Sequence, residues 1–466
     1  MTARIHRRDF IRRSLLSCAA GGALFGQFGQ MKVLNAAINA AAGGKAHADF
    51  KALVCVFLGG GNDSFNTLIP TSGSARTAYT DARGALALPG SDPLLPLTPS
   101  VPWSDGCSYA LHPGMEGLQQ LFQSGQCAVV ANVGPLLYPI TKNEFQNQLV
   151  PVPPQLFSHS DQTTAWQTSW TDSTERTGWG GRLVDAVMAG HANPPLSTCI
   201  SMDGANKFQI GNAVQPYFMD SDGGQSLFFI EDEWNADRRA SFLAIQQIAR
   251  QQGDSMFLRK HAQVMGQALD NYALVSAALN AGPTLTTTFP DSWLGRQLAM
   301  VARLISVRTA LGQTRQLYYV TQGGYDTHAT QLAGHDEILP DLSASMRAFY
   351  DATVELGIQN DVTQFTASDF GRTVSINGDG TDHGWGSHHF VVGGDVLGQR
   401  AYGTMPNLTA QGPDDAAWGQ IIPTLSVDQY AATLAAWYGV SAGDISSLVV
   451  PNLGRFSSPN LGFMAS

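Results

Sequence analysis

The stretch ALVCVFLGGGNDSFN, residues 52–66, joins an apolar run to a glycine-rich loop that carries a carboxylate. The run at residues 52–58 is apolar at every position, which is typical of a strand buried on both faces of a sheet. Three glycines follow and allow the chain to turn sharply before Asp63. The stretch therefore predicts a central strand whose carboxyl end presents a polar loop.

Three more apolar, β-rich runs have the same design, and they lie at residues 127–133, 316–321 and 362–366. Helix-like periodic segments separate the runs, at residues 114–123, 293–311 and 328–356. We expect Pro340 to interrupt the last of these segments. Strands that alternate with helices predict an α/β fold, a three-layer sandwich with a mostly parallel, doubly wound central sheet.

One interval does not follow this alternation. Residues from about 203–289 carry no strand-end motif, are rich in Gln, Asp and Ala, and contain a helix-like segment at 231–281. We therefore expect one α/β domain over residues 49–466 with a helical insertion at about 203–289. Near the C-terminus, Ser426 opens a capping-box sequence, and we expect the helix that follows it to end near Gly439.

The N-terminus has the order of an export signal. Paired arginines, Arg7 and Arg8, precede Phe10 and a weakly apolar run at residues 15–28, which is typical of a twin-arginine signal peptide. The signal would occupy residues 1–48, which end in the small-x-small sequence AHA, so the mature chain is expected to be periplasmic or secreted. The run is too short and too rich in Gly and Gln to cross a bilayer, and we expect no stable membrane span in the mature chain.

Two alternatives to this signal remain open. The first is that the segment is an ordinary basic amphipathic helix and not an export signal. The sequence LLSC at residues 15–18 has the form of a lipobox, but almost no apolar region separates Arg13 from Cys18.

The charge balance argues against a nucleic-acid partner. The 466 residues include 27 Lys and Arg against 37 Asp and Glu, a formal net charge of −10. Binding to a phosphate backbone depends on an excess of positive charge. The hydrophobic fraction of 44% fits a globular protein.

Cleavage after Ala48 would leave four cysteines, none of which belongs to a C-x-x-C pair, namely Cys55, Cys107, Cys127 and Cys199. A metal–thiolate site is therefore not expected. Cys55 and Cys127 lie inside apolar strand-like runs and are expected to be small buried thiols. One disulfide is compatible with an oxidising compartment, but the sequence does not indicate which two cysteines would form it.

Polar residues follow three of the predicted strands, and the carboxyl ends of parallel strands meet at one edge of a sheet. Asp63 follows the first strand, where an Asx-turn that caps the next element is an equal alternative to ligation. Asp326 and His328 lie two residues apart, so in an extended segment their side chains point the same way and could share one cation. A hydrogen-bonded turn is the alternative for this pair.

The segment SDFGRTVSINGDGTDHGWGSHHF, residues 368–390, adds Asp369 after the fourth strand and Arg372 three residues later. Arg372 is expected either to orient an anionic group or to form an ion pair with Asp369. The spacing does not match a calcium loop, because the sixth position is not glycine and a histidine occupies the twelfth. Of the adjacent pair His388 and His389, at most one is expected to enter the site.

Ser158 and His159 lie at the expected start of a helix. Ser160 and Asp161 could serve as helix N-caps. A helix N-terminus also stabilises a developing alkoxide, so Ser158 is a candidate nucleophile, and the sequence leaves both alternatives open.

Several stretches resemble a known family, in particular FLGGGNDSFNTLIP, FSHSDQTTAWQT, GGYDTH and the glycine-rich segment from residue 368 to residue 394. They occur, in the family's order, between about residues 51 and 456. The chain is similar to the bacterial twin-arginine-exported proteins of domain-of-unknown-function family 1501, related to the alkaline phosphatase-like and sulfatase-like superfamily.

The resemblance implies one or two divalent ions, with Zn, Mn, Ca and Mg as candidates. By position, Asp63 and Asp369 resemble the aspartates of the cation beside the nucleophile. Asp326, His328 and His383 resemble the ligands of the other cation.

Two departures from the superfamily pattern affect these ligands. Phe370 stands where a histidine usually follows the second aspartate, and the Asp326–His328 spacing is two residues instead of four.

The function implied by the resemblance is an exported metal-dependent hydrolase of phosphate or sulfate esters, acting on a small-molecule or glycan ester. Ser158 would be the nucleophile, and His159 and Arg372 would neutralise the oxygens of the transferred group. The alternative is a non-catalytic binding or export-partner protein that keeps the scaffold, and Phe370 favours it. A carbohydrate-binding surface protein is a third candidate, based only on nine tryptophans. The twin-arginine export machinery is the expected protein partner.

Overall fold

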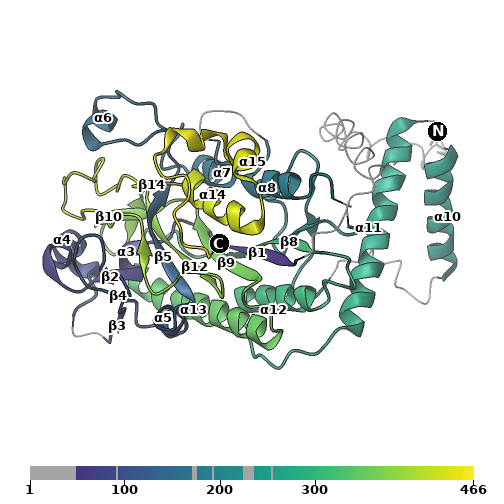
Figure 1. Cartoon of the computed structure of the whole chain (residues 1–466), viewed down its shortest axis with the longest axis horizontal. Coiled ribbons are helices and arrows are strands. Elements are labelled where there is room, and N and C mark those ends of the chain that lie inside the picture. Colours follow the sequence, from purple (N-terminus) through teal and green to yellow (C-terminus); the bar gives the residue numbers. More distant parts are fainter. Residues whose placement is uncertain are drawn as a thin grey trace, which may run out of the picture.

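The computed structural model describes residues 49–90, 93–170, 176–191, 194–223, 236–252 and 255–465 (Figure 1). The signal peptide expected at residues 1–48 lies outside the described residues. So do residues 224–235, which form part of the expected insertion.

The described residues form a central sheet of nine strands in the order β13-β5-β12-β9-β1-β8-β6-β7, with β14 paired to β5. These strands are β1 (Lys51–Leu58), β5 (Cys127–Gly134), β6 (Cys199–Ser201), β7 (Tyr217–Phe218), β8 (Arg315–Gln322), β9 (Val362–Ser368), β12 (Ser387–Gly393), β13 (Ala401–Tyr402) and β14 (Leu425–Ser426). Only β12 runs antiparallel to its neighbours β5 and β9 within this described sheet. The four strands predicted from apolar runs are all present.

Side chains of β1 alternate between two hydrophobic layers, as the pleat of a strand requires. Ala52 and Val54 belong to one layer, and Leu53 and Cys55 belong to the other. The first layer is covered by α5 (Glu116–Gln123), α12 (Trp293–Ser306) and α13 (Gln331–Glu355), and the second by α7 (His159–Thr168), α8 (Trp179–Val187) and α14 (Val427–Tyr438). Figure 1 shows these two groups of helices on opposite sides of the sheet. The predicted three-layer α/β sandwich is therefore confirmed.

Helix α13 continues through Pro340, so the predicted interruption is wrong. Proline removes one hydrogen bond, the one that the carbonyl of residue 336 would accept. The proline ring packs against Gly114, where a Cβ atom would lie only 2.5 Å from Pro340 Cγ. The helix therefore continues through the proline at a position where the ring is packed.

Helix α14 begins and ends as expected. Ser426 accepts from the backbone N–H of Gln429, whose side chain accepts from the N–H of Ser426. Gly439 ends the helix with φ of +107°. This conformation favours glycine.

Two long helices, α10 (Ala236–Gln252) and α11 (Met256–Ala281), lie side by side at one end of the molecule (Figure 1). They fall within the segment that was predicted to be helical. None of the described helices combines the length and the apolar character needed to cross a membrane.

Short elements complete the described chain. They are α3 (Ser64–Thr67), β2 (Leu68–Pro70), α4 (Gly73–Arg83), η1 (Gly84–Leu86), β3 (Leu95–Pro96), β4 (Tyr109–Leu111), α6 (Lys142–Gln146), β10 (Arg372–Ile376), β11 (Thr381–His383), α15 (Ala442–Asp444), η3 (Ile445–Val449) and η4 (Pro451–Arg455). Strands β10 and β11 form an antiparallel pair in which Arg372 lies opposite His383. This pairing brings the glycine-rich segment back to the edge of the main sheet.

The four cysteines after residue 48 are free and buried. Burial raises the pKa of the Cys55 and Cys127 thiols, so both stay neutral. The disulfide that the sequence left open is not formed between any two of these four residues.

Candidate metal centre

The candidate site lies where the loops after β1, β8 and β9 meet the start of α7 and the end of β11. Gly60 connects these segments: its N–H donates to Asp369 Oδ1 (3.2 Å) and its carbonyl accepts from Arg372 Nη1 (3.2 Å). Its φ is +119°, and a Cβ atom at this position would collide with the backbone nitrogen of Asp326. Only glycine allows the loops to approach this closely.

Asp326 is at the centre of the site, and three imidazole rings converge on its carboxylate. Oδ1 lies 3.1 Å from His328 Nε2 and 3.3 Å from His383 Nε2. Oδ2 lies 3.4 Å from His159 Nε2. The three rings come from separate elements of the chain, and each presents the same nitrogen to the carboxylate.

The opposite nitrogen of His383 and of His159 is held by an acceptor. His383 Nδ1 lies 2.7 Å from the carbonyl oxygen of Phe157, and His159 Nδ1 lies 2.6 Å from Asp369 Oδ2. A carbonyl or carboxylate oxygen only accepts, so Nδ1 of both rings carries the hydrogen. In the neutral rings, Nε2 then presents a lone pair to Asp326. Metal-binding histidines are usually held in this way.

His328 is held more loosely, with Nδ1 at 3.3 Å from Asp382 Oδ1. Its Nε2 lies 2.9 Å from His383 Nε2. A hydrogen on His328 Nε2 would make this contact an ordinary hydrogen bond to His383 Nε2, and a cation between the two nitrogens would also satisfy both lone pairs.

The donor set fits a divalent transition metal. His159, Asp326 and His383 each offer one ligand atom, and these atoms lie within 4.8 Å of one another. His159 Nε2 is buried and has no hydrogen-bond partner in the described part of the chain. Imidazole nitrogens together with a carboxylate suit Zn²⁺ and its first-row neighbours, whereas Mg²⁺ and Ca²⁺ prefer oxygen ligands. His328 Nε2 lies beside this group, 3.1 Å from Asp326 Oδ1 and 2.9 Å from His383 Nε2.

The electrostatics favour the metal-binding forms of Asp326 and His383. Partial burial alone would raise the pKa of Asp326, but the hydrogen bond and charge of Arg372 lower it below its usual value. Burial lowers the pKa of His383. A charged carboxylate and a neutral imidazole are the ligand forms.

The structure brings six of the eight predicted site residues together, namely His159, Asp326, His328, Asp369, Arg372 and His383. The contacts give some of them different partners from those expected. Asp369 bonds His159 and the N–H of Gly60, and no contact joins it to Asp63 among the described residues. Arg372 is buried and forms its ion pair with Asp326 (2.5 Å) and not with Asp369, the partner expected from the sequence.

Asp63 does not lie in this cluster, because its carboxylate is buried and bonded elsewhere. Arg83 donates to both of its oxygens, at 2.5 and 2.6 Å, and Gln331 donates to Oδ2. Oδ1 also accepts from the N–H groups of Phe65 and Asn66 and caps α3. The Asx-turn alternative is therefore the one that the structure adopts. Burial would raise the pKa of Asp63, but the Arg83 charge holds it below its usual value.

Ser158 occupies the N-cap position of α7, but its hydroxyl does not cap the helix. Its Oγ donates to Asp161 Oδ2 at 2.7 Å and lies 3.2 Å from Ser160 Oγ. These bonds direct the hydroxyl to its own helix and not to the three histidines. These contacts do not test whether Ser158 is the nucleophile expected from the sequence.

Phe370 is buried beside two of the clustered histidines, His159 and His383. Its ring centroid lies 4.8 Å from that of His159 and 4.7 Å from that of His383. A Cβ atom at Gly61 would collide with the Phe370 ring, and Gly61 has φ of +86°. The phenyl ring therefore forms an apolar wall against the two imidazoles, in the sequence position where the superfamily resemblance implies a histidine.

Three groups that contact the cluster were given no role from the sequence, namely Asp382, the Phe157 carbonyl and the Gly60 backbone. Asp382 directly precedes His383 in the glycine-rich segment. The two backbone groups carry no side-chain signal. His388 and His389 are both buried in β12, where they contact Asn132 N–H and Thr366 Oγ1, and neither belongs to the cluster.

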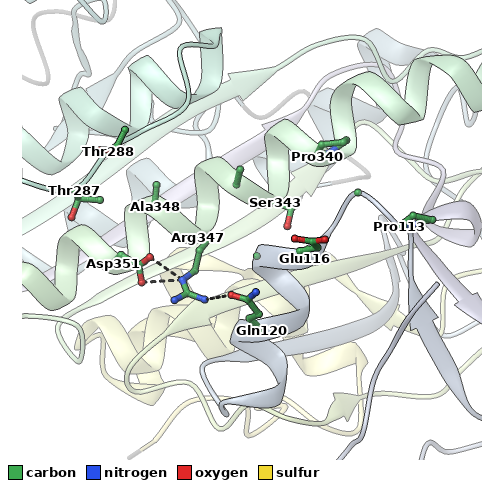
Figure 2. Close-up of a pocket in the computed structure, with 13 residues that line it drawn as sticks. Pro113, Glu116, Gln120, Thr287, Thr288, Pro340, Ser343, Arg347, Ala348 and Asp351 are labelled. Carbon is green, nitrogen blue, oxygen red and sulfur yellow. Dashed lines mark hydrogen bonds and ion pairs between the residues drawn. The ribbon is translucent and has the colours of Figure 1, made fainter. Parts of the chain in front are cut away.

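A separate surface groove of about 790 Å³ lies between α5, α13 and the segment with Thr287 and Thr288 (Figure 2). Figure 2 shows Arg347, one of the lining residues, bonded to Asp351 and Gln120. Its cation is thus already neutralised by a neighbour. The groove contains none of the six clustered residues, and we place the candidate site at Asp326.

The fold and the site define an α/β protein with a histidine–aspartate candidate metal centre at the carboxyl edge of its sheet. The family model described as "Protein of unknown function (DUF1501)" matches residues 50–416, and the chain belongs to this family. No curated protein matches the sequence.

Solved structures give distant similarities. Ps i-CgsB in complex with k-i-k-neocarrahexaose has 10% identity and a TM-score of 0.36 over 88% of this chain and 77% of that chain. The PsFucS1 sulfatase from Pseudoalteromonas sp. has 9% identity and a TM-score of 0.33 over 95% of this chain and 74% of that chain. These scores are too low to carry an argument about the site.

Proposed function

We propose that this protein is an exported metal-dependent hydrolase of sulfate or phosphate esters. One observation carries the proposal: three Nε2 atoms converge on Asp326 while each Nδ1 faces an oxygen acceptor. Such an arrangement points one nitrogen of each ring at a common carboxylate and places an oxygen acceptor behind the other nitrogen, as metal sites require.

His159, Asp326, His328 and His383 would hold the ion. A bound divalent ion would supply Lewis-acid catalysis, polarising an ester oxygen and lowering the pKa of a water molecule. Asp369 and the Phe157 carbonyl keep hydrogen on the far nitrogen of two rings. Arg372 keeps Asp326 ionised.

The side chains of Asp326 and His328 are each 46% exposed, so an ester could reach them from solvent, whereas Phe370 is buried against the His159 and His383 rings. The motif resemblance to the alkaline phosphatase-like and sulfatase-like superfamily selects sulfate and phosphate esters, including esters on glycans. The paired arginines Arg7 and Arg8 support export to the periplasm or beyond it.

The test is to purify the protein, measure bound metal by elemental analysis, and screen nitrophenyl sulfate, phosphate and phosphodiester substrates. The parent protein should carry one divalent ion per chain and hydrolyse at least one ester. Asp326→Ala should lose both properties, and His261→Ala, which changes an exposed histidine on α11, should lose neither. Parent protein that binds no metal would refute the proposal. Stoichiometric metal without turnover would support the binding or export-partner alternative instead.

A further inference from the structure

Asp63 and Arg83 form an ion pair with both side chains fully buried. The two guanidinium nitrogens lie 2.5 and 2.6 Å from the two carboxylate oxygens, a bidentate geometry. With the N–H of Phe65 at 3.0 Å and the amide of Gln331, both oxygens are fully occupied. Asp63 therefore has its cation inside the chain and offers no free oxygen to a metal ion.

A continuous set of hydrogen bonds leads from this pair to the candidate metal centre. Gln331 Nε2 donates to Asp63 Oδ2, and Gln331 Oε1 accepts from Thr381 Oγ1 at 2.6 Å. Thr381 Oγ1 accepts from Arg372 Nε at 3.3 Å, and its carbonyl accepts from Arg372 Nη2. Arg372 Nη1 then donates to Asp326 Oδ1 at 2.5 Å.

The direction of each bond is determined by chemistry. A carboxylate only accepts, so the amide nitrogen of Gln331 must face Asp63 and its oxygen must face Thr381. The Thr381 hydroxyl has one hydrogen, which it gives to Gln331, and it can then only accept from Arg372. Gln331, Thr381 and Arg372 are all fully buried. In a buried network each bond reinforces the next, and a missing partner is costly.

We infer that the Asp63–Arg83 ion pair, through Gln331 and Thr381, positions Arg372 and thereby Asp326 for metal binding, and that the centre on Asp326 takes a single ion. The inference rests on the metal centre of the proposed function. It also explains why a second ion, the one that the superfamily resemblance assigns to Asp63 and Asp369, does not fit. Arg83 is paired with both carboxylate oxygens of Asp63, and Asp369 is bonded to His159 and Gly60. Gln331 and Thr381 are positioning residues, since neither touches the ion.

The test measures zinc stoichiometry and affinity in the full chain by competition with a chromophoric chelator. Gln331→Met removes the amide and keeps the length of the side chain. Gln209→Met is the matched control, because Gln209 is also fully buried but bonds Asn206 and the carbonyls of Ile200 and Leu317. Both variants should lose thermal stability. Only Gln331→Met should bind zinc more weakly, by about 10- to 100-fold.

A second pair of variants protects the test against poor folding. Thr381→Val keeps the shape but removes the hydroxyl and should weaken zinc binding about tenfold, whereas Thr381→Ser keeps the hydroxyl and should restore it. Two ions per chain, or equal affinity in Gln331→Met and Gln209→Met, would overturn the inference and leave the proposed function standing. Parent protein without zinc affinity would overturn both.

Discussion

His159 Nδ1 lies 2.6 Å from Asp369 Oδ2, although the two residues are 210 positions apart. The other Asp369 oxygen accepts from the N–H of Gly60, and the carboxylate is nearly buried. Asp369 is thus held from two sides and fixes the orientation of the His159 ring. The aspartate that resembles a metal ligand in the sequence instead orients a histidine that faces Asp326.

Removing this acceptor should weaken metal binding without destroying the fold. In Asp369→Ala the ring of His159 is free to rotate and to change tautomer, so we expect metal affinity to fall by about 10- to 100-fold. Titration with a competing chelator measures the change. Asp291→Ala removes a highly exposed carboxylate and should leave the affinity unchanged. Equal affinities in the two variants would show that Asp369 does not orient a ligand.

His383 and His328 should contribute differently to metal affinity. His383 is held by a 2.7 Å bond to a backbone carbonyl, while His328 is 46% exposed and lies 3.3 Å from Asp382. Because a fixed ligand loses less freedom on binding, His383→Ala should reduce metal affinity more than His328→Ala. Isothermal titration calorimetry on both variants tests the order, and the reverse order would contradict the assigned geometry.

Asp63 should matter to stability. Asp63→Asn leaves the buried Arg83 without its counter-charge, so we expect the free energy of unfolding to fall by about 3–5 kcal/mol. Urea denaturation measures this loss. Adding Arg83→Met removes the unpaired charge and should recover part of the stability. A loss below about 1 kcal/mol, the value of an exposed pair, would indicate that water reaches the site.

The buried Asp428 should make stability depend on pH. Burial raises the pKa of Asp428 to about 7, above the ordinary value of 3.8. The folded state therefore holds this proton more tightly than the unfolded state. Its stabilisation is complete below pH 3.8 and is lost as the pH rises through about 7, at up to about 1.4 kcal/mol per pH unit. Asp428→Asn should lack this component when denaturation is measured between about pH 4 and pH 8. Parallel curves for variant and parent would contradict the assignment.

Ser158→Ala tests the predicted nucleophile. Because Ser158 Oγ donates to Asp161, we expect kcat to stay within about tenfold of the parent value, the scale of one lost hydrogen bond. Loss of a serine that attacks the substrate would instead lower kcat by several orders of magnitude. Steady-state kinetics on the ester found in the screen distinguishes the two outcomes.

The sheet could be predicted because a strand buried on both faces appears in the sequence as a short apolar run. Residues 52–58 are apolar at every position since both faces of β1 pack against helices. The other three predicted strands are also largely buried, although they include polar residues such as Asn132 and Gln364. Pro340 misled the prediction because α13 continues through it, and its ring packs against Gly114, a residue distant in the sequence. The cap at Ser426 was predictable, since all its partners lie within one turn.

The sequence by itself determined the α/β architecture and the set of polar side chains at the carboxyl edge of the sheet, because apolar periodicity and strand-end position are local properties. Only the tertiary structure decided what each carboxylate does. Asp63 is neutralised by Arg83, Asp369 orients His159, and Asp326 receives three imidazoles. The role of a charged group depends on the donors within hydrogen-bond distance, and here those donors come from elements that folding alone brings together.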